Sequence, residues 1–336
     1  MVNSQPFIKF APRNVPLNRR KQTAAVVAWM MLVPSLLVLF LFLASFKSLM
    51  PFALAYIIYI YLDPAPEMGG RKVAWLRNLP LWVYMRDFFP MKLVKTCDLD
   101  PSRNYVFGYH PHGIIGVGAW VNFATEANGF SNMFHGIDLR LLTLTLNFNV
   151  PLVHDFLLAM GVCAVSRRSC DNILTEKPGS SLMIVVGGAV ETCEAFPGTL
   201  NLILKKRLGF IKLALRTGSP LVPVLSFGEN DLWDQVPNPQ GSYIRQMQDL
   251  SRKYTSVVPP LLHGRGIFNY NVGILPHRRQ LVSVVGRPIE VPKLPNPTLE
   301  EVQFYQKKYL DELQHIFDTY KDEYYAHRVS DLAFIE

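Results

Sequence analysis

Two histidines, His110 and His112, flank a proline directly after the apolar run 105–107, and Gly113 follows them. Histidine is the side chain whose ordinary pKa lets it take up or release a proton near neutral pH. The proline restricts the backbone, and the glycine leaves space beside it. We therefore interpret this stretch as a strand end that carries a proton-transfer site. One histidine is the base and the other supports it, and His112 is favoured over His110 as the base.

A catalytic histidine needs an acid to orient it, and the sequence offers Glu191. This residue follows a short apolar run through Gly187 and Gly188, which allow close approach of the backbone. The run, the glycine turn and the carboxylate together resemble a second edge of a site. Glu194 and Glu229 are alternatives, and a solvated loop carboxylate is the non-functional interpretation of Glu191.

Metal catalysis and covalent catalysis are two other chemistries that must be weighed. No further cluster of His, Cys and Asp stands at ligand spacing from the histidine pair, so no metal site is predicted. The chain lacks the G-x-S-x-G motif, and Cys163 and Cys193 have no basic partner nearby in sequence. Direct transfer is simpler: a histidine deprotonates an acceptor hydroxyl, which then attacks an activated carbonyl.

The N-terminal part of the chain is typical of a membrane anchor. Residues 24–46 are 23 consecutive positions without a charge, and as a helix they would span about 35 Å, enough for a bilayer core of about 30 Å. A second apolar run, 49–62, is short for a full span. Two tilted spans and a re-entrant hairpin therefore both remain open. A cleavable signal peptide is the competing interpretation.

The distribution of charge narrows the partners. The net charge is +8, and five Lys and Arg residues precede the apolar stretch without an acid before Asp63. Such a flank favours the cytosolic side of a membrane. An anionic membrane or an anionic substrate is expected, and nucleic acid is not. We predict a basic cytosolic segment at 1–23, a membrane hairpin or two transmembrane helices at 24–62, and one cytosol-facing domain at 63–336.

Beyond the anchor, short apolar runs alternate with longer mixed segments. This is the pattern of an α/β fold, with a mixed sheet flanked by helices. The last helix has the clearest start, because Thr298 and Glu301 form a capping-box pattern. The predicted strands are 105–109, 181–186, 221–227 and 281–285, and the other predicted helices are 116–127, 139–146 and 210–216.

Four blocks of this chain, in order, resemble the diacylglycerol acyltransferase type 2 family, which includes monoacylglycerol and wax-alcohol acyltransferases. The resemblance covers nearly the whole chain and implies a glycerolipid-acyltransferase-like fold. It also implies esterification of a lipid hydroxyl, such as that of diacylglycerol, with acyl-CoA as co-substrate and no other cofactor. The expected location is the cytosolic face of the endoplasmic reticulum membrane and the surface of lipid droplets. The blocks are 109–113, 186–191, 207–214 and 222–231.

Carried onto this chain, the His-Pro-His-Gly block of the family falls on 110–113, which supports His112 as the base with Glu191 as its partner. One departure stands out. The wider glycerolipid acyltransferases place an Asp five residues after the catalytic histidine, whereas Ile115 and Val117 occupy those positions here. A distant acid must then orient the base.

The phosphates of acyl-CoA require cations near the site. Arg207 and Lys212 belong to a basic run that could supply them, and a face resting on anionic lipid headgroups is the alternative. Glu229 and Asn230 are a polar pair that follows the third predicted strand, and they either shape the substrate pocket or cap the structure. The remaining candidates for substrate binding are the glycines at the two edges and this polar pair, namely Gly113, Gly187, Gly188, Glu229 and Asn230.

The sequence leaves the acceptor open between diacylglycerol, monoacylglycerol and a long-chain alcohol, because a few methylene-sized contacts can decide such selectivity. A catalytically silent lipid-droplet protein and a lipid hydrolase are the two other functions to be separated from a transferase. The oligomeric state is open as well, with a homo-oligomer as one arrangement.

Overall fold

The computed structural model describes residues 8–335, apart from 237–240, 244–245, 248–249 and 251–261. Its centre is a seven-stranded sheet with the order β1-β10-β7-β2-β5-β3-β4. All neighbours are parallel except β10 and β7, so the mixed sheet expected from the sequence is confirmed. The strands are β1 Lys92–Lys95, β2 Val106–His110, β3 Asp138–Thr143, β4 Cys163–Ala164, β5 Ser180–Val185, β7 Leu221–Phe227 and β10 Val282–Val285.

Two short sheets lie outside this one. In the first, β11 (Ala333–Ile335), close to the C-terminus, runs parallel to β6 (Asn201–Ile203). In the second, β8 (Asp234–Gln235) pairs with β9 (Leu262–His263) in the antiparallel sense. The first of these brings the end of the chain beside the segment that follows the glycine turn.

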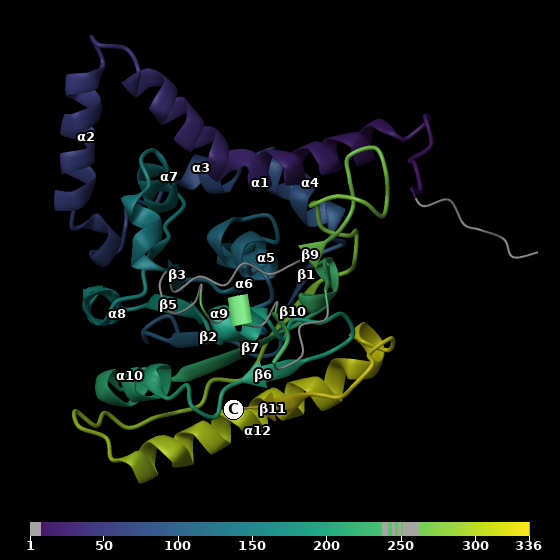
Figure 1. The fold of residues 1–336 in the computed structure, drawn as a ribbon. Helices are drawn as coiled ribbons and strands as arrows, with labels where there is room; N and C mark the ends of the chain where they lie inside the picture. Colours follow the sequence, from purple (N-terminus) through teal and green to yellow (C-terminus); the bar gives the residue numbers. More distant parts are fainter. Residues whose placement is uncertain (1–7, 237–240, 244–245, 248–249, 251–261, 336) are drawn as a thin grey trace, which may run out of the picture.

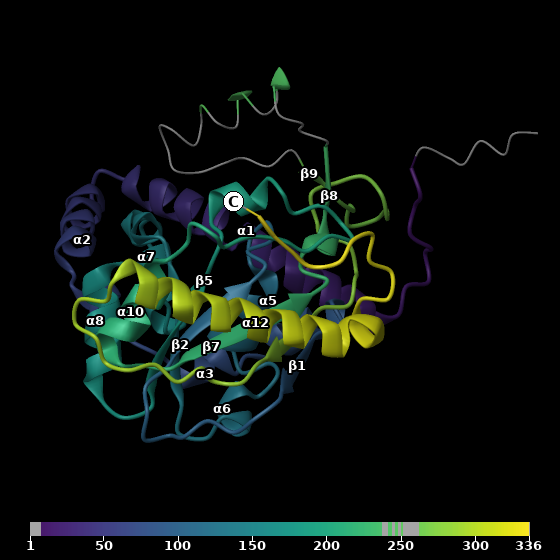
Figure 2. The ribbon, with the colours of Figure 1, turned by 90° about the horizontal axis from the view of Figure 1, so that it is seen from below.

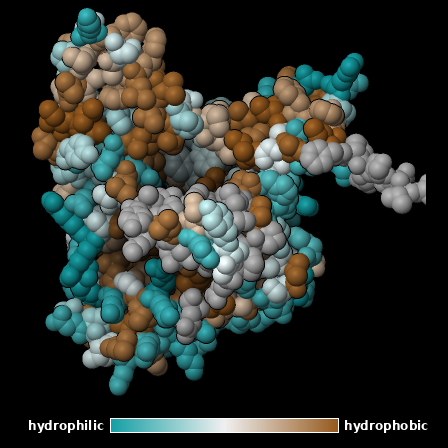
Figure 3. All heavy atoms as spheres, in the orientation of Figure 1, coloured by the Kyte–Doolittle hydropathy of each residue, from teal (hydrophilic) through white to brown (hydrophobic). Residues whose placement is uncertain are grey.

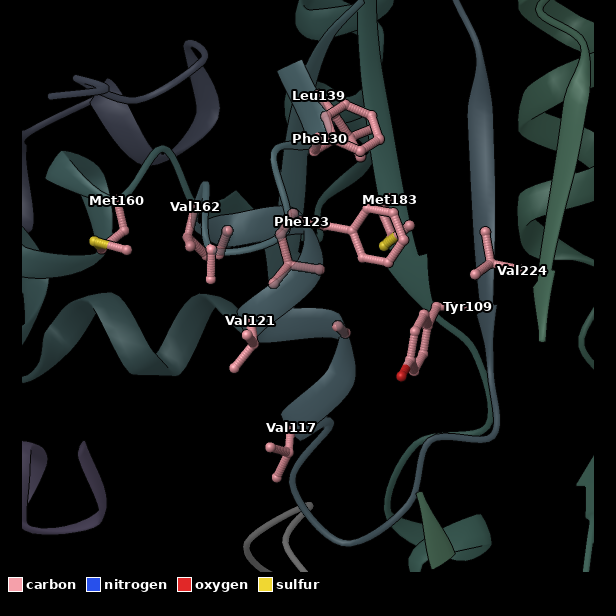
Figure 4. Close-up of a cluster of buried hydrophobic side chains, with 14 of the residues drawn as sticks. Tyr109, Val117, Val121, Phe123, Phe130, Leu139, Met160, Val162, Met183 and Val224 are labelled. Atoms are coloured by element: carbon pink, nitrogen blue, oxygen red, sulfur yellow. The ribbon is translucent and has the colours of Figure 1, made fainter. Parts of the chain in front are cut away.

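Both faces of the central strands are buried, and the alternation along β2 decides which core each side chain enters. Phe107 and Tyr109 enter the core beneath α5, whereas Val106 and His110 face the core beneath α12. Figure 4 shows Tyr109 among the apolar side chains of the core beneath α5. Figure 2 shows α12 crossing the face of the sheet that carries β2 and β7.

Helices cover both faces of the sheet (Figure 1). The longest of them in the body, α12, begins at the predicted capping box, where the Thr298 hydroxyl accepts from the Glu301 N–H and the Glu301 carboxylate accepts from the Thr298 N–H. The body helices are α3 Ala74–Arg77, α4 Pro80–Phe88, α5 Val117–Ala119, α6 Phe130–Met133, α7 Val153–Ala159, α8 Arg167–Glu176, α9 Ala189–Thr192, α10 Gly209–Thr217 and α12 Leu299–Tyr324, with a π-helical turn at Trp120–Ala124.

Most predicted elements are confirmed: the four predicted strands correspond to β2, β5, β7 and β10, and the helix at 210–216 corresponds to α10. The helix predicted at 139–146 is wrong, because 138–143 is strand β3, buried between β5 and β4. A continuous apolar run does not distinguish a buried strand from a buried helix. The helix predicted at 116–127 is present only as short α5 and the π-helical turn, which end at Ala124.

The N-terminal segment forms two helices, α1 Leu17–Ala44 and α2 Met50–Leu62. The first half of α1 lies along α4, and Ala25 and Val26 are buried there (Figure 1). Its second half and α2 display apolar side chains, visible as the brown area above the domain in Figure 3. Among the described residues, α1 is the one helix long and apolar enough to cross a membrane.

Candidate active site

Three parallel strands bring the predicted site residues to one edge of the sheet. β2 pairs with both β5 and β7 in the parallel sense, so their carboxyl ends lie side by side. His112 follows β2, Glu191 follows β5 and Glu229 follows β7. In open α/β sheets, ligands bind in the crevice outside the carboxyl ends of the strands. Spacing along the chain does not predict that these three residues lie close together, whereas the register of the sheet brings them to the same edge.

The imidazole of His112 is held by the turn that follows it. Its Nδ1 lies 3.1 Å from the carbonyl oxygen of Gly113 and 3.4 Å from Oγ1 of Thr192. Burial lowers the pKa of His112, and the positive charge of Arg207 adds to the effect. His112 as a whole residue is partly exposed. Its imidazole is therefore neutral near pH 7 and has a fixed orientation.

The carboxylate of Glu191 contacts the main chain of His112. Its Oε1 accepts from the backbone N–H of His112 at 2.6 Å, and its Oε2 accepts from the N–H of Ile203 at 2.8 Å. The side chain is 1% exposed, and this burial raises the pKa of Glu191 to about 7. We expected this acid to orient the imidazole itself. The contact fixes the backbone that carries the ring, while the Gly113 carbonyl binds the ring nitrogen.

A second buried carboxylate, Glu229, holds the other side of the turn. It accepts from the N–H groups of Val117 at 2.7 Å and Gly118 at 3.0 Å, and from the Tyr109 hydroxyl at 2.7 Å. Burial raises the pKa of Glu229 to about 7. A Cβ added to Gly113 would lie 2.6 Å from the Glu229 Cγ. Of the two roles that the sequence leaves open for Glu229, these contacts favour the structural one, because donors enclose its carboxylate.

Asn230, for which the sequence leaves pocket shaping and structural capping open, also makes a structural contact. Its side chain is 2% exposed, and its Nδ2 donates to the carbonyl oxygen of Thr199 at 2.9 Å. The residue follows β7 directly, in a 3₁₀ turn that runs through Leu232. Asn230 therefore ties two loops together within the fold.

The other histidine, His110, is fully buried on the opposite side of the turn from solvent. Its Nε2 lies 2.8 Å from the hydroxyl of Tyr309 on α12, and that hydroxyl also lies 3.1 Å from the Gly108 carbonyl oxygen. Burial lowers the pKa of His110 to about 3. Sequence reasoning missed Tyr309, because 199 positions separate it from His110. Only its place on the inner face of α12 could have marked it.

A cleft of about 630 Å³ lies beside the glycine turn. Gly187 and Gly188 form part of its wall, and Arg207 and Lys212 line it. The guanidinium of Arg207 donates to the Gly187 carbonyl oxygen at 3.0 Å. The remaining wall is largely apolar, with Val185, Val186, Leu208, Phe210 and Leu213 among its members.

This edge of the sheet thus combines a neutral imidazole, two buried carboxylates that hold the turn carrying it, and a cationic cleft. Within the described residues, no group of three or more His, Cys, Asp or Glu side chains is arranged to hold a metal ion. Acid-base catalysis on a substrate with an anionic part is what such an arrangement can perform.

Comparisons with known proteins identify the class. A family model described as diacylglycerol acyltransferase matches residues 39–335. The chain is 48% identical to diacylglycerol O-acyltransferase 2B of Umbelopsis ramanniana, over 100% of this chain and 97% of that protein. It is 46% identical to diacylglycerol O-acyltransferase 2 of Dictyostelium discoideum, over 94% and 96% of the two chains. It is 42% identical to 2-acylglycerol O-acyltransferase 1 of Bos taurus, again over 94% and 96%.

With these matches, the protein is an acyltransferase enzyme of lipid biosynthesis. It belongs to the diacylglycerol acyltransferase family. Among solved structures, the 1-acyl-sn-glycerophosphate (LPA) acyltransferase of Thermotoga maritima is similar over 88% of this chain and 93% of its own, with a TM-score of 0.37 and 11% identity. The assignment to the family rests on the sequence matches.

Proposed function

We propose that this protein is an acyl-CoA-dependent O-acyltransferase that esterifies diacylglycerol to triacylglycerol by direct transfer, with His112 as the general base. The observation that carries this proposal is the contact between the Nδ1 of His112 and the Gly113 carbonyl oxygen. A carbonyl oxygen only accepts hydrogen bonds, so Nδ1 bears the proton. The Nε2 atom then has a free lone pair with which it can accept a proton.

In the proposed reaction, Nε2 of His112 takes the proton of the acceptor hydroxyl while the hydroxyl oxygen attacks the thioester carbonyl of acyl-CoA. A carbon–oxygen bond forms and the carbon–sulfur bond breaks. The imidazolium returns its proton to the departing thiolate, so the products are an ester and free CoA. Direct transfer is favoured over a cysteine intermediate, because burial raises the pKa of Cys170, the thiol in the cleft wall, to about 11.

The choice of His112 over His110 rests on access and on protonation. His110 is 0% exposed, whereas His112 is partly exposed. The Tyr309 hydroxyl occupies the Nε2 of His110 at 2.8 Å. We therefore assign His110 a supporting role: it fixes the end of β2 against α12.

We assign the cleft beside Gly187 to acyl-CoA. Its volume of about 630 Å³ falls within the usual range of roughly 300–1,000 Å³ for small-molecule sites. Arg207 and Lys212 suit the phosphates, and the apolar wall suits the pantetheine and acyl chain. Because its charge also acts on His112, Arg207 links the cleft to the base.

The acceptor alcohol would come from the membrane. Trp29 of α1 lies 6.3 Å, between ring centroids, from Trp120 in the turn that follows the histidine block. The anchor therefore packs against the segment that follows the histidine block. From Val33 onward most apolar side chains of the anchor are at least partly exposed, apart from the buried Phe40 and Ile60. The exposed part of α1, from Val33 to Ala44, and the 13 residues of α2 reach only about 18–20 Å each. This is less than the roughly 30 Å of a bilayer core.

These lengths favour a re-entrant hairpin over two full spans, with the body on the cytosolic face of the endoplasmic reticulum or on a lipid droplet. Monoacylglycerol remains the main alternative acceptor, since a relative at 42% identity is named a 2-acylglycerol O-acyltransferase. A comparison of the reaction rates with diacylglycerol and with monoacylglycerol decides between the two acceptors.

The test is a microsomal assay in cells that lack neutral-lipid synthesis. Labelled acyl-CoA is supplied with diacylglycerol, with monoacylglycerol, with a long-chain alcohol, or with no acceptor. We expect triacylglycerol as the main product, and a drop of at least 100-fold for His112→Gln. The control is His135→Gln, the same change at an exposed histidine. Full activity of His112→Gln at equal expression would overturn the assignment of the base. Free fatty acid formed without acceptor would indicate a hydrolase.

The acyl-CoA cleft is tested separately with Arg207→Ala. We expect the KM for acyl-CoA to rise by about tenfold through loss of a charge-assisted contact with phosphate. Lys307→Ala, which removes an exposed cation on α12, is the control. If Arg207 binds a phosphate of CoA, competition by free CoA weakens in Arg207→Ala; equal inhibition of both enzymes would contradict the assignment.

A further inference from the structure

We infer that residues 265–275, together with the N-terminal arm 8–17, form a second membrane contact that rests on anionic lipid headgroups beside the hairpin. This inference builds on the proposed membrane anchor. It concerns a surface that the acyl-transfer site does not use. The occupant to which it commits is the headgroup layer of the same bilayer that holds α1 and α2.

The arm and the loop form one ordered unit. Ala11 donates its N–H to the Phe268 carbonyl oxygen at 2.8 Å, and Tyr270 donates its N–H to the Lys9 carbonyl oxygen at 2.9 Å. The side chain of Asn271 accepts from the Lys9 N–H at 2.8 Å. Main-chain bonds therefore fix the position of the side chains between them.

This unit presents large apolar side chains to solvent. Phe10 is 73% exposed and Phe268 is 77% exposed, so two aromatic rings of this ordered unit lie open to solvent. Leu17, Ile267 and Ile274 add aliphatic side chains that are 65%, 49% and 58% exposed. Exposed aromatic and aliphatic side chains on one ordered unit that also carries basic residues are typical of a membrane-surface contact. Aromatic rings at such an edge fit the interfacial layer of a bilayer.

The charge around the patch selects the lipid. Residues 8–23 and 262–280 contain eight Lys and Arg residues and no Asp or Glu. Two of the eight pack against aromatic rings: Arg265, which is 8% exposed, lies over the ring of Tyr270 at 4.9 Å, and the partly buried Arg278 lies over the ring of Phe88 at 4.3 Å. The other six are exposed to solvent. Such a one-signed surface is complementary to an anionic leaflet.

The position of the unit agrees with that of the anchor. In Figure 1, α1 runs along one edge of the molecule, with α2 at its C-terminal end and the arm and loop at its N-terminal end. Figure 3 shows apolar surface at both ends of that edge. A membrane that receives the hairpin would therefore also meet the arm and loop, and two separated contacts would fix the tilt of the domain over the bilayer.

The test measures lipid contact residue by residue in the full chain. The substitutions Phe268→Cys, Phe46→Cys and Glu300→Cys are made one at a time in a Cys97→Ser background, in which the three remaining native cysteines are buried. Each is labelled with an environment-sensitive fluorophore and reconstituted in vesicles with 30% phosphatidylserine. Quenching by a lipid that carries a shallow doxyl group is compared with quenching by aqueous iodide. Phe46 reports the hairpin tip, and Glu300, exposed on α12, reports the aqueous side.

We expect doxyl quenching at 46 and 268, iodide quenching at 300, and at least a twofold loss of quenching at 268 when phosphatidylserine is replaced by phosphatidylcholine. Quenching at 46 with iodide accessibility at 268 equal to that at 300 would overturn the second contact and leave the anchor intact. Iodide accessibility at both 46 and 268 would overturn the anchor as well. Because no activity is measured, neither result bears on the acyl-transfer chemistry.

Discussion

The replacement Glu191→Gln tests whether a buried carboxylate positions the base through its backbone. The carboxylate accepts two N–H groups, from His112 at 2.6 Å and from Ile203 at 2.8 Å. Gln keeps one acceptor oxygen and turns the other position into an NH₂ donor, which would face an N–H group. A buried donor left unpaired costs about 1–3 kcal/mol. If this cost is expressed in the transition state, kcat falls roughly 5- to 150-fold.

The pH dependence of activity gives the same test a second readout. Burial raises the pKa of Glu191, and that of Glu229, to about 7. Protonation of either carboxylate would place an O–H group, a donor, where an oxygen now accepts a hydrogen bond from an N–H group. The wild-type rate should therefore fall as the pH drops below about 7, with both carboxyls contributing. In Glu191→Gln one of them no longer titrates, so the acid limb should become shallower.

Stability should change with pH in the opposite direction. Each folded pKa of about 7 lies above the ordinary carboxyl value of 4.5, so the folded state binds more protons than the unfolded state between these values. The stabilising contribution is complete below about pH 4.5 and is lost as the pH rises through 7. The slope is at most about 1.4 kcal/mol per pH unit for each group. Glu191→Gln should remove the share of Glu191.

The assay is the initial rate of triacylglycerol formation from pH 5.5 to 9 with purified enzyme in lipid nanodiscs, together with Tm over the same range. Glu300→Gln, the same change at an exposed carboxylate, is the matched control. A Glu191→Gln enzyme with wild-type kcat at pH 8 and an unchanged acid limb would refute the positioning role of Glu191.

Two further replacements probe the supports of the site. Tyr309→Phe leaves the Nε2 of the buried His110 without its hydroxyl partner, so the free energy of unfolding should drop by about 1–3 kcal/mol, and an unchanged Tm would contradict that contact. Gly113→Ala places a methyl group 2.6 Å from the Glu229 Cγ at a φ of +60°, so activity should fall more than tenfold by displacement of the turn. Gly241→Ala, at a φ of +84° in open space, should keep its activity, and equal activity of the two variants would show that the crowding is harmless.

Much of the fold could be predicted because local sequence patterns determine it. The strands β2, β5 and β7 are short apolar runs bounded by turn residues, and the capping box at Thr298 marks the start of α12. Strand β3 could not be predicted in this way. All of its central side chains are buried, so no alternation separates it from a helix.

The sequence by itself determined the histidine block, the glycine turn, the basic apolar N-terminus and the resemblance to an acyltransferase family, since each depends on residues that are neighbours in the chain. Tertiary structure alone decided how the two histidines are held. Glu191 meets the N–H of His112 across 79 positions, and Tyr309 meets His110 across 199. Such contacts follow from the parallel register of β2 and β5 and from the packing of α12. Spacing along the chain carries no information about either, because a sheet joins strands through space.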